Sequence, residues 1–168
     1  MSKPFVAILM GSKSDLPTMQ AGAEILDKMQ IEYEIKITSA HRTPAATQQY
    51  IADAEARGCQ VFISAAGLAA HLAGATAAHT TRPVIGVPID AGPLQGMDAL
   101  LSTVQMPAGI PVATVAIGKT GAKNAAYLAA QIMGLKDEAL AGRVAEERQE
   151  NSRNVQAQDA ELQSSRQQ

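Results

Sequence analysis

The sequence predicts an α/β protein built on a five-stranded parallel sheet. Five short apolar runs of strand length alternate with segments in which apolar residues recur at helical spacing. This alternation is typical of units in which a crossover helix joins each parallel strand to the next. Because such crossovers are right-handed, we expect a doubly wound, flavodoxin-like three-layer sandwich with the strand order 2-1-3-4-5.

Glycine and proline mark the ends of the predicted strands. The first apolar run lies between Pro4 and Gly11, and the fourth is expected to end at Val87, just before Pro88. The predicted strands cover residues 5–10, 33–37, 61–65, 84–87 and 112–117.

The helical patterns carry their own start and stop signals. Apolar residues repeat at helical spacing from Leu16 onward, and Ser14 or Asp15 is expected to cap this helix. Pro44 suits the first position of a second helix, which Gly58 should end. Further helical segments are expected within residues 66–79, 97–104 and 118–134.

The 168 residues suit one domain with a sizeable core. We expect a flavodoxin-like catalytic region, residues 1–134, with a C-terminal helical extension, residues 135–168, as part of the same domain. Beyond residue 146 the chain is rich in Gln, Ser and charge, with Val155 and Leu162 as isolated apolar residues. Two interpretations stay open: disorder of the last ten or so residues, or a helix docked on a neighbouring subunit.

Composition narrows the choice of compartment and partners. A net charge of −2 offers no basic surface for nucleic acid. The single cysteine, Cys59, cannot form an internal disulfide, and without a recognisable secretory signal this favours the cytoplasm. No apolar run approaches the roughly 20 residues of a membrane span, so no membrane association is expected.

Residues 38–44, which follow the second predicted strand, contain an imidazole, a guanidinium and several hydroxyl groups. Open α/β sheets bind ligands at the carboxyl ends of their strands. The imidazole of His41 can give and take a proton at neutral pH, and Arg42 can bind a phosphate or carboxylate with two hydrogen bonds. A cation is unfavourable at a helix N-terminus, so an anionic ligand would account for Arg42. We therefore favour a ligand site, with Ser39 beside it, over an ordinary surface pair.

A second candidate site follows the first strand, in residues 11–15. Hydroxyls and backbone N–H groups at a helix start attract anions. Asp15 would repel a phosphate but could accept hydrogen bonds from a ribose diol, with Ser12 and Ser14 nearer the phosphate. The alternative, simple N-capping by Ser14 or Asp15, stays open.

The segment 67–74 places His71 among Gly, Ala and Leu. Small side chains allow a flat ligand to approach the backbone there. A partly buried histidine with its hydrogen bonds satisfied is the simpler interpretation, and it is favoured on these residues alone.

Other apparent motifs fail. Residues 118–120, Gly-Lys-Thr, resemble the end of a phosphate-binding P-loop, but the glycine required five residues earlier is Ala113. The three histidines match no zinc spacing, so no metal is expected. Asp90 is interpreted as a solvated loop carboxylate.

Five stretches, in this order along the chain, together resemble one family. They are MGSKSD at residues 10–15, SAHRTP at 39–44, AAHL at 69–72, VQMP with GIPV at 104–112, and AIGK with GAKNAA at 116–126. Each motif is weak alone, but the ordered set is specific. It is similar to the class I N5-carboxyaminoimidazole ribonucleotide mutases of bacterial purine biosynthesis, the family of the phosphoribosylaminoimidazole carboxylase catalytic subunit, over roughly residues 6–135.

The resemblance implies an isomerase that needs no cofactor. It moves a carboxylate from the exocyclic nitrogen of an aminoimidazole ribonucleotide to a ring carbon, with His41 as the general acid and base. His71 would lie beside the carboxylate or carbon dioxide. Substrate binding falls to Ser12, Ser14, Asp15, Ser39, Arg42, Gly67 and Leu72. The family is typically a homo-octamer whose C-terminal helices pack on neighbouring subunits.

The chain departs from the family pattern at three positions. Leu68 replaces the second of two glycines, Ala73 replaces a proline, and Ala91 stands where a serine is usual. Two alternatives stay open beside the mutase. One is the related carboxylase, which uses carbon dioxide directly and carries Lys at the position of Arg42. The other is a nucleotide-binding module of the same fold without turnover.

Overall fold

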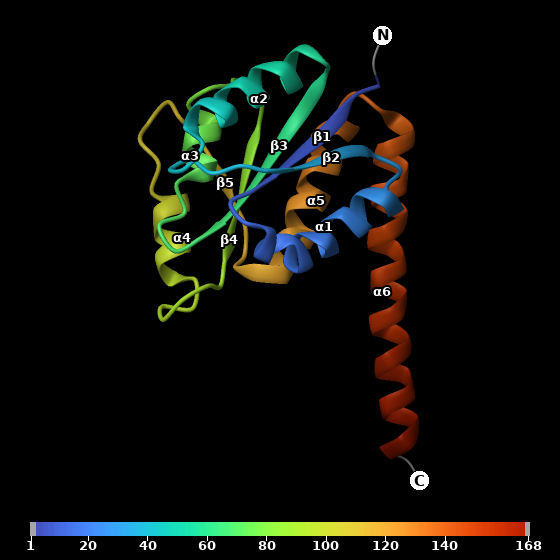
Figure 1. Ribbon diagram of the computed structural model, residues 1–168. Helices are drawn as coiled ribbons and strands as arrows, with labels where there is room; N and C mark the ends of the chain where they lie inside the picture. The colour runs from blue at the N-terminus through green and yellow to red at the C-terminus, as the bar shows by residue number, and fades with distance from the viewer. Residues whose placement is uncertain (1–2, 167–168) are drawn as a thin grey trace.

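In the computed structural model, which describes residues 3–166, five parallel strands form one sheet in the order β2-β1-β3-β4-β5 (Figure 1). This is the predicted order. The strands are β1 (Phe5–Met10), β2 (Glu32–Ile37), β3 (Cys59–Gly67), β4 (Val84–Ile89) and β5 (Ala113–Thr114). β2 and β3 lie on opposite sides of β1, so the order in which strands are added to the sheet reverses at β1. At such a switch point the loops after β1 and β3 lead to opposite faces of the sheet and leave a crevice between them.

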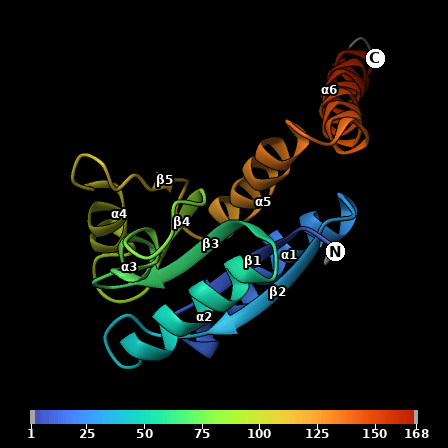
Figure 2. The same ribbon diagram turned by 90° about the horizontal axis from the view of Figure 1, so that it is seen from above.

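Helices cover both faces of the sheet and complete the predicted three layers. α1 and α5 lie on one face, and α2, α3 and α4 on the other (Figure 2). The helical elements are the 3₁₀ turn η1 (Lys13–Asp15), α1 (Leu16–Lys28), α2 (Pro44–Ala56), α3 (Leu72–Ala77), α4 (Met97–Val104), α5 (Gly118–Gly134) and α6 (Glu138–Arg166).

The alternation of side chains along β1 divides the core in two. Val6, Ile8 and Met10 point to the α1 and α5 face, while Phe5, Ala7 and Leu9 point to the α2 and α3 face. All six residues of β1 are buried because the strand lies inside the sheet between β2 and β3. A continuous apolar run is what a strand covered on both faces requires.

β4 is longer than predicted. The sequence predicts an end at Val87, because proline cannot donate a ladder hydrogen bond. Instead Pro88 pairs with Ala66 of β3, and the strand continues to Ile89. The missing N–H of Pro88 costs no ladder bond, because β5 pairs with β4 only at Ile85 and Gly86.

β5 is shorter than predicted. The expected strand, 112–117, is reduced to two residues, although the N–H of Val115 still donates to the carbonyl of Gly86 at 3.1 Å. The backbone therefore leaves the edge of the sheet early, and α5 begins at Gly118. Apolar composition alone does not reveal where an edge strand stops pairing.

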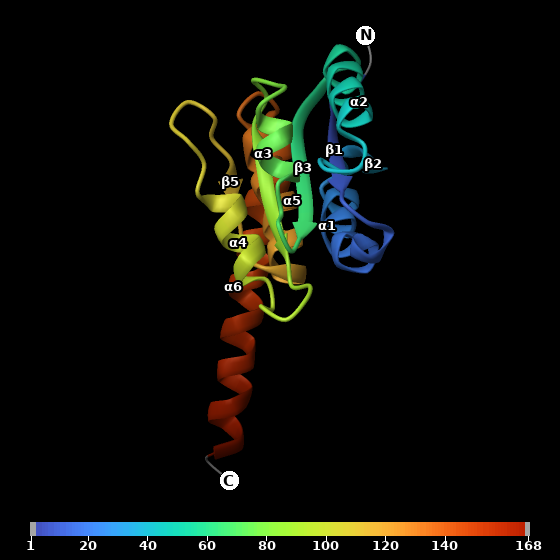
Figure 3. The same cartoon turned by 60° about the vertical axis from the view of Figure 1, so that its left-hand side comes forward.

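α6 extends away from the sheet as a long helix (Figures 1 and 3). Leu140 and Val144 join the core on the α1 and α5 face, whereas residues 148–166 are exposed. Of the two interpretations left open for the last ten or so residues, disorder is wrong through Arg166, because the helix continues to that residue. Local pairs such as Glu150 with Arg153 support the exposed turns. Residues 167 and 168 lie outside the described part of the chain.

Within residues 3–166, no helix combines the length and the apolar character needed to cross a membrane.

Candidate active site

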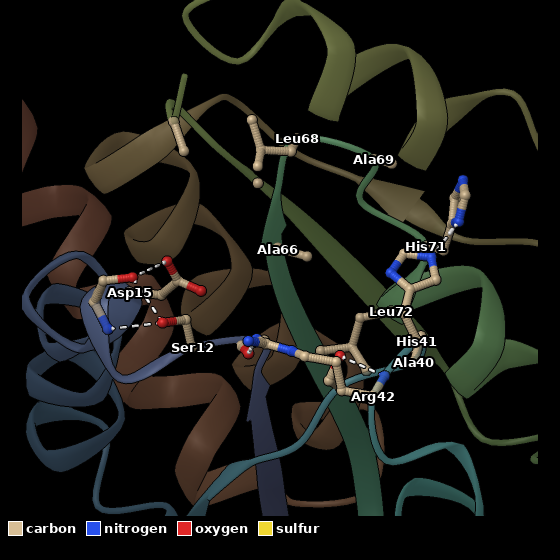
Figure 4. Close-up of a pocket in the computed structure, with 15 residues that line it drawn as sticks. Ser12, Asp15, Ala40, His41, Arg42, Ala66, Leu68, Ala69, His71 and Leu72 are labelled. Atoms are coloured by element: carbon tan, nitrogen blue, oxygen red, sulfur yellow. Dashed lines mark hydrogen bonds between the residues drawn. The ribbon is translucent and has the colours of Figure 1, made fainter.

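A cavity of about 510 Å³ lies at the carboxyl ends of the strands. The loops after β1, β2, β3 and β4 all contribute to its walls (Figure 4). The lining residues are Gly11, Ser12, Ser14, Asp15, Ser39, Ala40, His41, Arg42, Ala66, Gly67, Leu68, Ala69, His71, Leu72 and Ala91. All nine residues named from the sequence as catalytic or substrate-binding are among them.

Two histidines from different loops meet in this cavity. His41 Nε2 lies 2.7 Å from His71 Nδ1, and the rings are arranged edge to face with centroids 4.8 Å apart. At this distance one proton lies between the two nitrogens, so one ring donates and the other accepts. His71 is exposed rather than partly buried, and the hydrogen-bond partner of its ring is another histidine of the cavity.

Hydroxyl groups hold the loop that carries His41. Thr38 Oγ1 lies 2.6 Å from Thr47 Oγ1 and 3.3 Å from Thr43 Oγ1, and both Thr38 and Thr47 are buried. The N–H of Ser39 donates to Thr43 Oγ1 at 2.9 Å. Together these bonds tie the end of β2 to the first turns of α2. The sequence offers no sign of this network, because Thr38 and Thr47 are nine residues apart.

Thr47→Val is expected to lower the free energy of unfolding by about 1–3 kcal/mol. Valine keeps the shape of threonine but removes the 2.6 Å partner of Thr38, which leaves that buried hydroxyl only the longer 3.3 Å contact with Thr43. A poorly paired buried hydroxyl costs up to about that much. Denaturant unfolding measures the effect, and Thr47→Ser should restore most of it. Equal stability of the Val variant and the unaltered protein would show that the network does not hold the loop.

Arg42 joins the loop after β2 to the end of β1. Its Nη2 donates to the carbonyl of Gly11 at 3.1 Å, and its backbone N–H donates to Ser39 Oγ at the same distance. The guanidinium therefore lies across the cavity floor, reaching towards Ser12 (Figure 4). This posture leaves further N–H donors in the cavity for an anionic ligand.

The turn after β1 presents two hydroxyls and a carboxylate. Ser14 Oγ lies 2.8 Å from Ser12 Oγ and 3.4 Å from Asp15 Oδ1. Asp15 is the N-cap residue of α1, as expected, but its side chain makes no capping bond; instead Ser12 Oγ accepts from the N–H of Ser14. Burial raises the pKa of Asp15, whose side chain belongs to a residue only 7% exposed.

Asp15→Asn is expected to raise the melting temperature at neutral pH. The folded pKa of Asp15 lies above its ordinary value of 3.8, so ionisation opposes folding. That cost is absent below the ordinary pKa and complete above the folded pKa. The stability gain of the Asn variant should therefore appear as pH rises through this window and vanish in acid. Melting curves across pH measure it, and a gain that does not change with pH would contradict the account.

The loop that carries His71 is anchored on α4. The buried Ala70 donates its N–H to Ser102 Oγ at 3.0 Å, and Ser102 in turn donates to the carbonyl of Asp98 at 2.7 Å. α3 begins directly after His71, and the carbonyl of His71 accepts from Ala75. The position of His71 is thus fixed by its backbone, while its side chain is left to face His41.

Several lining residues were not named from the sequence as site residues. They are Gly11, Ala40, Ala66, Leu68, Ala69 and Ala91. Each lies at or just after the carboxyl end of a strand, and this position is the only feature of the sequence that could have indicated a place in the site. Small and apolar side chains give no chemical sign of a site.

The remaining sequence candidates lie elsewhere. His79 borders a different hollow, at the opposite end of β4. Asp90 is exposed after β4, close to Gly118 at the start of α5. Within residues 3–166, no three His, Cys, Asp or Glu side chains are grouped as a metal site.

The fold and the cavity together define a flavodoxin-like α/β protein with an enzyme-like site at the carboxyl edge of its sheet. A family model described as AIR carboxylase matches residues 5–154. The chain is 54% identical to the N5-carboxyaminoimidazole ribonucleotide mutase of Bacillus subtilis, over 90% of this chain and 93% of that protein. It is 57% identical to the mutase of Pseudomonas aeruginosa, over 78% of this chain and 80% of that protein.

A solved structure agrees with these relatives. The crystal structure of Treponema denticola PurE aligns with a TM-score of 0.87 at 33% identity, over 95% of this chain and 99% of that one. The chain belongs to the AIR carboxylase family.

Proposed function

We propose that this protein is an isomerase that converts N5-carboxyaminoimidazole ribonucleotide to 4-carboxy-5-aminoimidazole ribonucleotide in purine biosynthesis. The observation that carries the proposal is the contact between His41 and His71 inside a cavity that also holds Arg42 and Asp15. Relatives of 52–57% identity are named as this mutase.

His41 supplies the proton steps. The bond between the exocyclic nitrogen and the carboxylate breaks, its electron pair stays on nitrogen, and His41 delivers a proton there. The ring carbon then attacks the released carbon dioxide, and His41 takes back the proton which that carbon loses. One proton is given and one is returned, so the sum is an isomerisation. An imidazole positioned in this way contributes about 10²–10⁴ to the rate.

His71 acts beside the moving carboxylate. Because its Nδ1 is 2.7 Å from His41 Nε2, a carboxylate within reach of one ring is also near the other. The hydrogen bond between the rings also couples their tautomers before substrate enters, because His41 Nε2 donates only when His71 Nδ1 accepts, and the reverse.

The polar wall orients the ribonucleotide. Arg42 and the hydroxyls of Ser12, Ser14 and Ser39 bind the phosphate, and Asp15 accepts hydrogen bonds from the ribose diol. Gly67 and Leu72 line the side on which the aminoimidazole lies. The chemistry assigned to these residues needs no cofactor and no metal, because proton transfer and confinement of carbon dioxide complete it.

We also propose that the protein acts in the cytoplasm as a homo-octamer, with residues 135–168 as a helical extension of a single catalytic domain. The exposed length of α6, residues 148–166, supports a packing role against neighbouring subunits. Light scattering measures the mass of the assembly.

A substrate comparison tests the activity. Purified protein receives either the N-carboxylated ribonucleotide or aminoimidazole ribonucleotide with bicarbonate, and the 4-carboxylated product is followed. Product from the first substrate alone is expected. Product from the second alone would instead identify a carboxylase, and binding of either ribonucleotide without product would identify a non-catalytic module.

A further inference from the structure

The cavity has two chemically different walls. Arg42, Ser12 and Asp15 form a polar side, while the residues after β3 form an apolar side across from them (Figure 4). Leu68 is the largest side chain at the exposed rim of that apolar side, and 52% of the residue is exposed. Leu72, by contrast, is fully buried and packs into the core.

Leu68 is held in an uncommon backbone conformation. Its φ is +57°, in the left-handed region that leucine adopts rarely. The side chain is seated against the loop after β4, where a Cβ added at Gly92 would lie 2.5 Å from Leu68 Cδ2. The bare backbone of Gly92 is therefore what makes room for Leu68. Backbone strain of this kind persists where the surrounding structure imposes it, and it gathers at functional sites.

The loops beneath Leu68 are packed closely. A Cβ added at Gly67 would lie 2.8 Å from Ala91 Cβ, so the end of β3 and the loop after β4 touch. Leu68 extends this contact outward over the cavity rim, and Ala91 and Leu68 both line the cavity. The two loops thus form an apolar side of the same cavity that the histidine pair lines.

We propose that Leu68 is a specificity-determining residue that keeps carbon dioxide in the site between the two bond-changing steps. This inference rests on the proposed mutase function. Carbon dioxide is small, uncharged and without hydrogen-bond donors, so an apolar wall retains it by dispersion contacts and by excluding water. If it escapes after the nitrogen–carbon bond has broken, the enzyme is left with aminoimidazole ribonucleotide, which is then released.

The ratio of released aminoimidazole ribonucleotide to 4-carboxylated product, corrected for decay without enzyme, measures this escape. The ratio is expected to rise about threefold to fivefold in Leu68→Ala and Leu68→Gly, the order of effect that a few lost dispersion contacts produce. Leu68→Met should stay near the unaltered protein. Leu94→Ala is the matched control, because Leu94 is 60% exposed on the neighbouring loop and does not line the cavity.

This ratio separates retention of carbon dioxide from simple loop packing. A packing role would change the overall rate without changing the ratio of released aminoimidazole ribonucleotide to 4-carboxylated product. Unchanged ratios in the Ala and Gly variants would overturn the proposal. Should Leu68→Ala fail to fold, Leu68→Gly decides by the same criterion, since glycine suits a positive φ. Failure of the unaltered protein to convert the N-carboxylated substrate would instead overturn the proposed function.

Discussion

His41→Asn is expected to lower kcat by about 10²–10⁴-fold while ribonucleotide binding persists. Asparagine keeps a polar side chain of similar reach but cannot exchange a proton at neutral pH. The guanidinium of Arg42 and the carboxyl of Asp15 lie away from the His41 ring (Figure 4), so the phosphate and ribose contacts proposed for them should persist. Initial rates measure the loss, and calorimetry with the 4-carboxylated product measures binding.

A matched variant guards against general effects of losing a histidine. His79→Asn alters an exposed histidine outside this cavity and should leave kcat unchanged. His71→Asn should also reduce kcat, and the double variant should lose much less than the product of the two single losses, because the paired rings act as one unit. Near-normal turnover by His41→Asn would contradict the assignment of the proton carrier.

Gly22→Leu is expected to destabilise the fold by about 3 kcal/mol or more. α1 and α5 approach so closely that even a Cβ at Gly22 would lie 2.6 Å from the backbone oxygen of Ala122. That oxygen belongs to a helix backbone and cannot turn aside as a side chain would. A leucine must therefore separate the two helices that cover one face of the sheet.

Gly142→Leu is the control for this substitution, and denaturant unfolding measures both variants. Gly142 is exposed on α6 with nothing within 4 Å of an added Cβ. There leucine should add up to about 0.8 kcal/mol of stability, since it forms helix better than glycine. Similar effects of the two substitutions would show that the close approach of α1 and α5 does not limit stability.

Strand order and helix placement could be predicted because they depend on the spacing of apolar residues and on the glycines and prolines that end each element. Gly58 adopts a positive φ after α2, as its predicted stop signal requires, and Pro44 opens that helix. The errors arose where pairing partners decide the outcome. Pro88 stays within β4 because β5 does not reach it, and this depends on a neighbouring strand that the local sequence does not describe.

The site residues could be named because they lie in contiguous motifs at strand ends and match a family pattern. The contacts that hold these residues in place could not be predicted from the sequence. The contact between His41 and His71 spans 30 positions, and the bond between Thr38 and Thr47 depends on how the loop folds back. The position of Leu68 was visible only as a departure from the family pattern. Its positive φ and its seat against Gly92 emerged from the packing of two loops.

The fate of the carboxylate carbon tests the central claim most directly. The N-carboxylated substrate, labelled with ¹³C in its carboxylate, is converted by the unaltered protein in excess unlabelled bicarbonate, and mass spectrometry follows the product. The proposed mechanism keeps carbon dioxide in the site between the two steps, so the label is expected to remain in the 4-carboxylated product. Product that carries the unlabelled carbon of the buffer would contradict a mutase with a closed site.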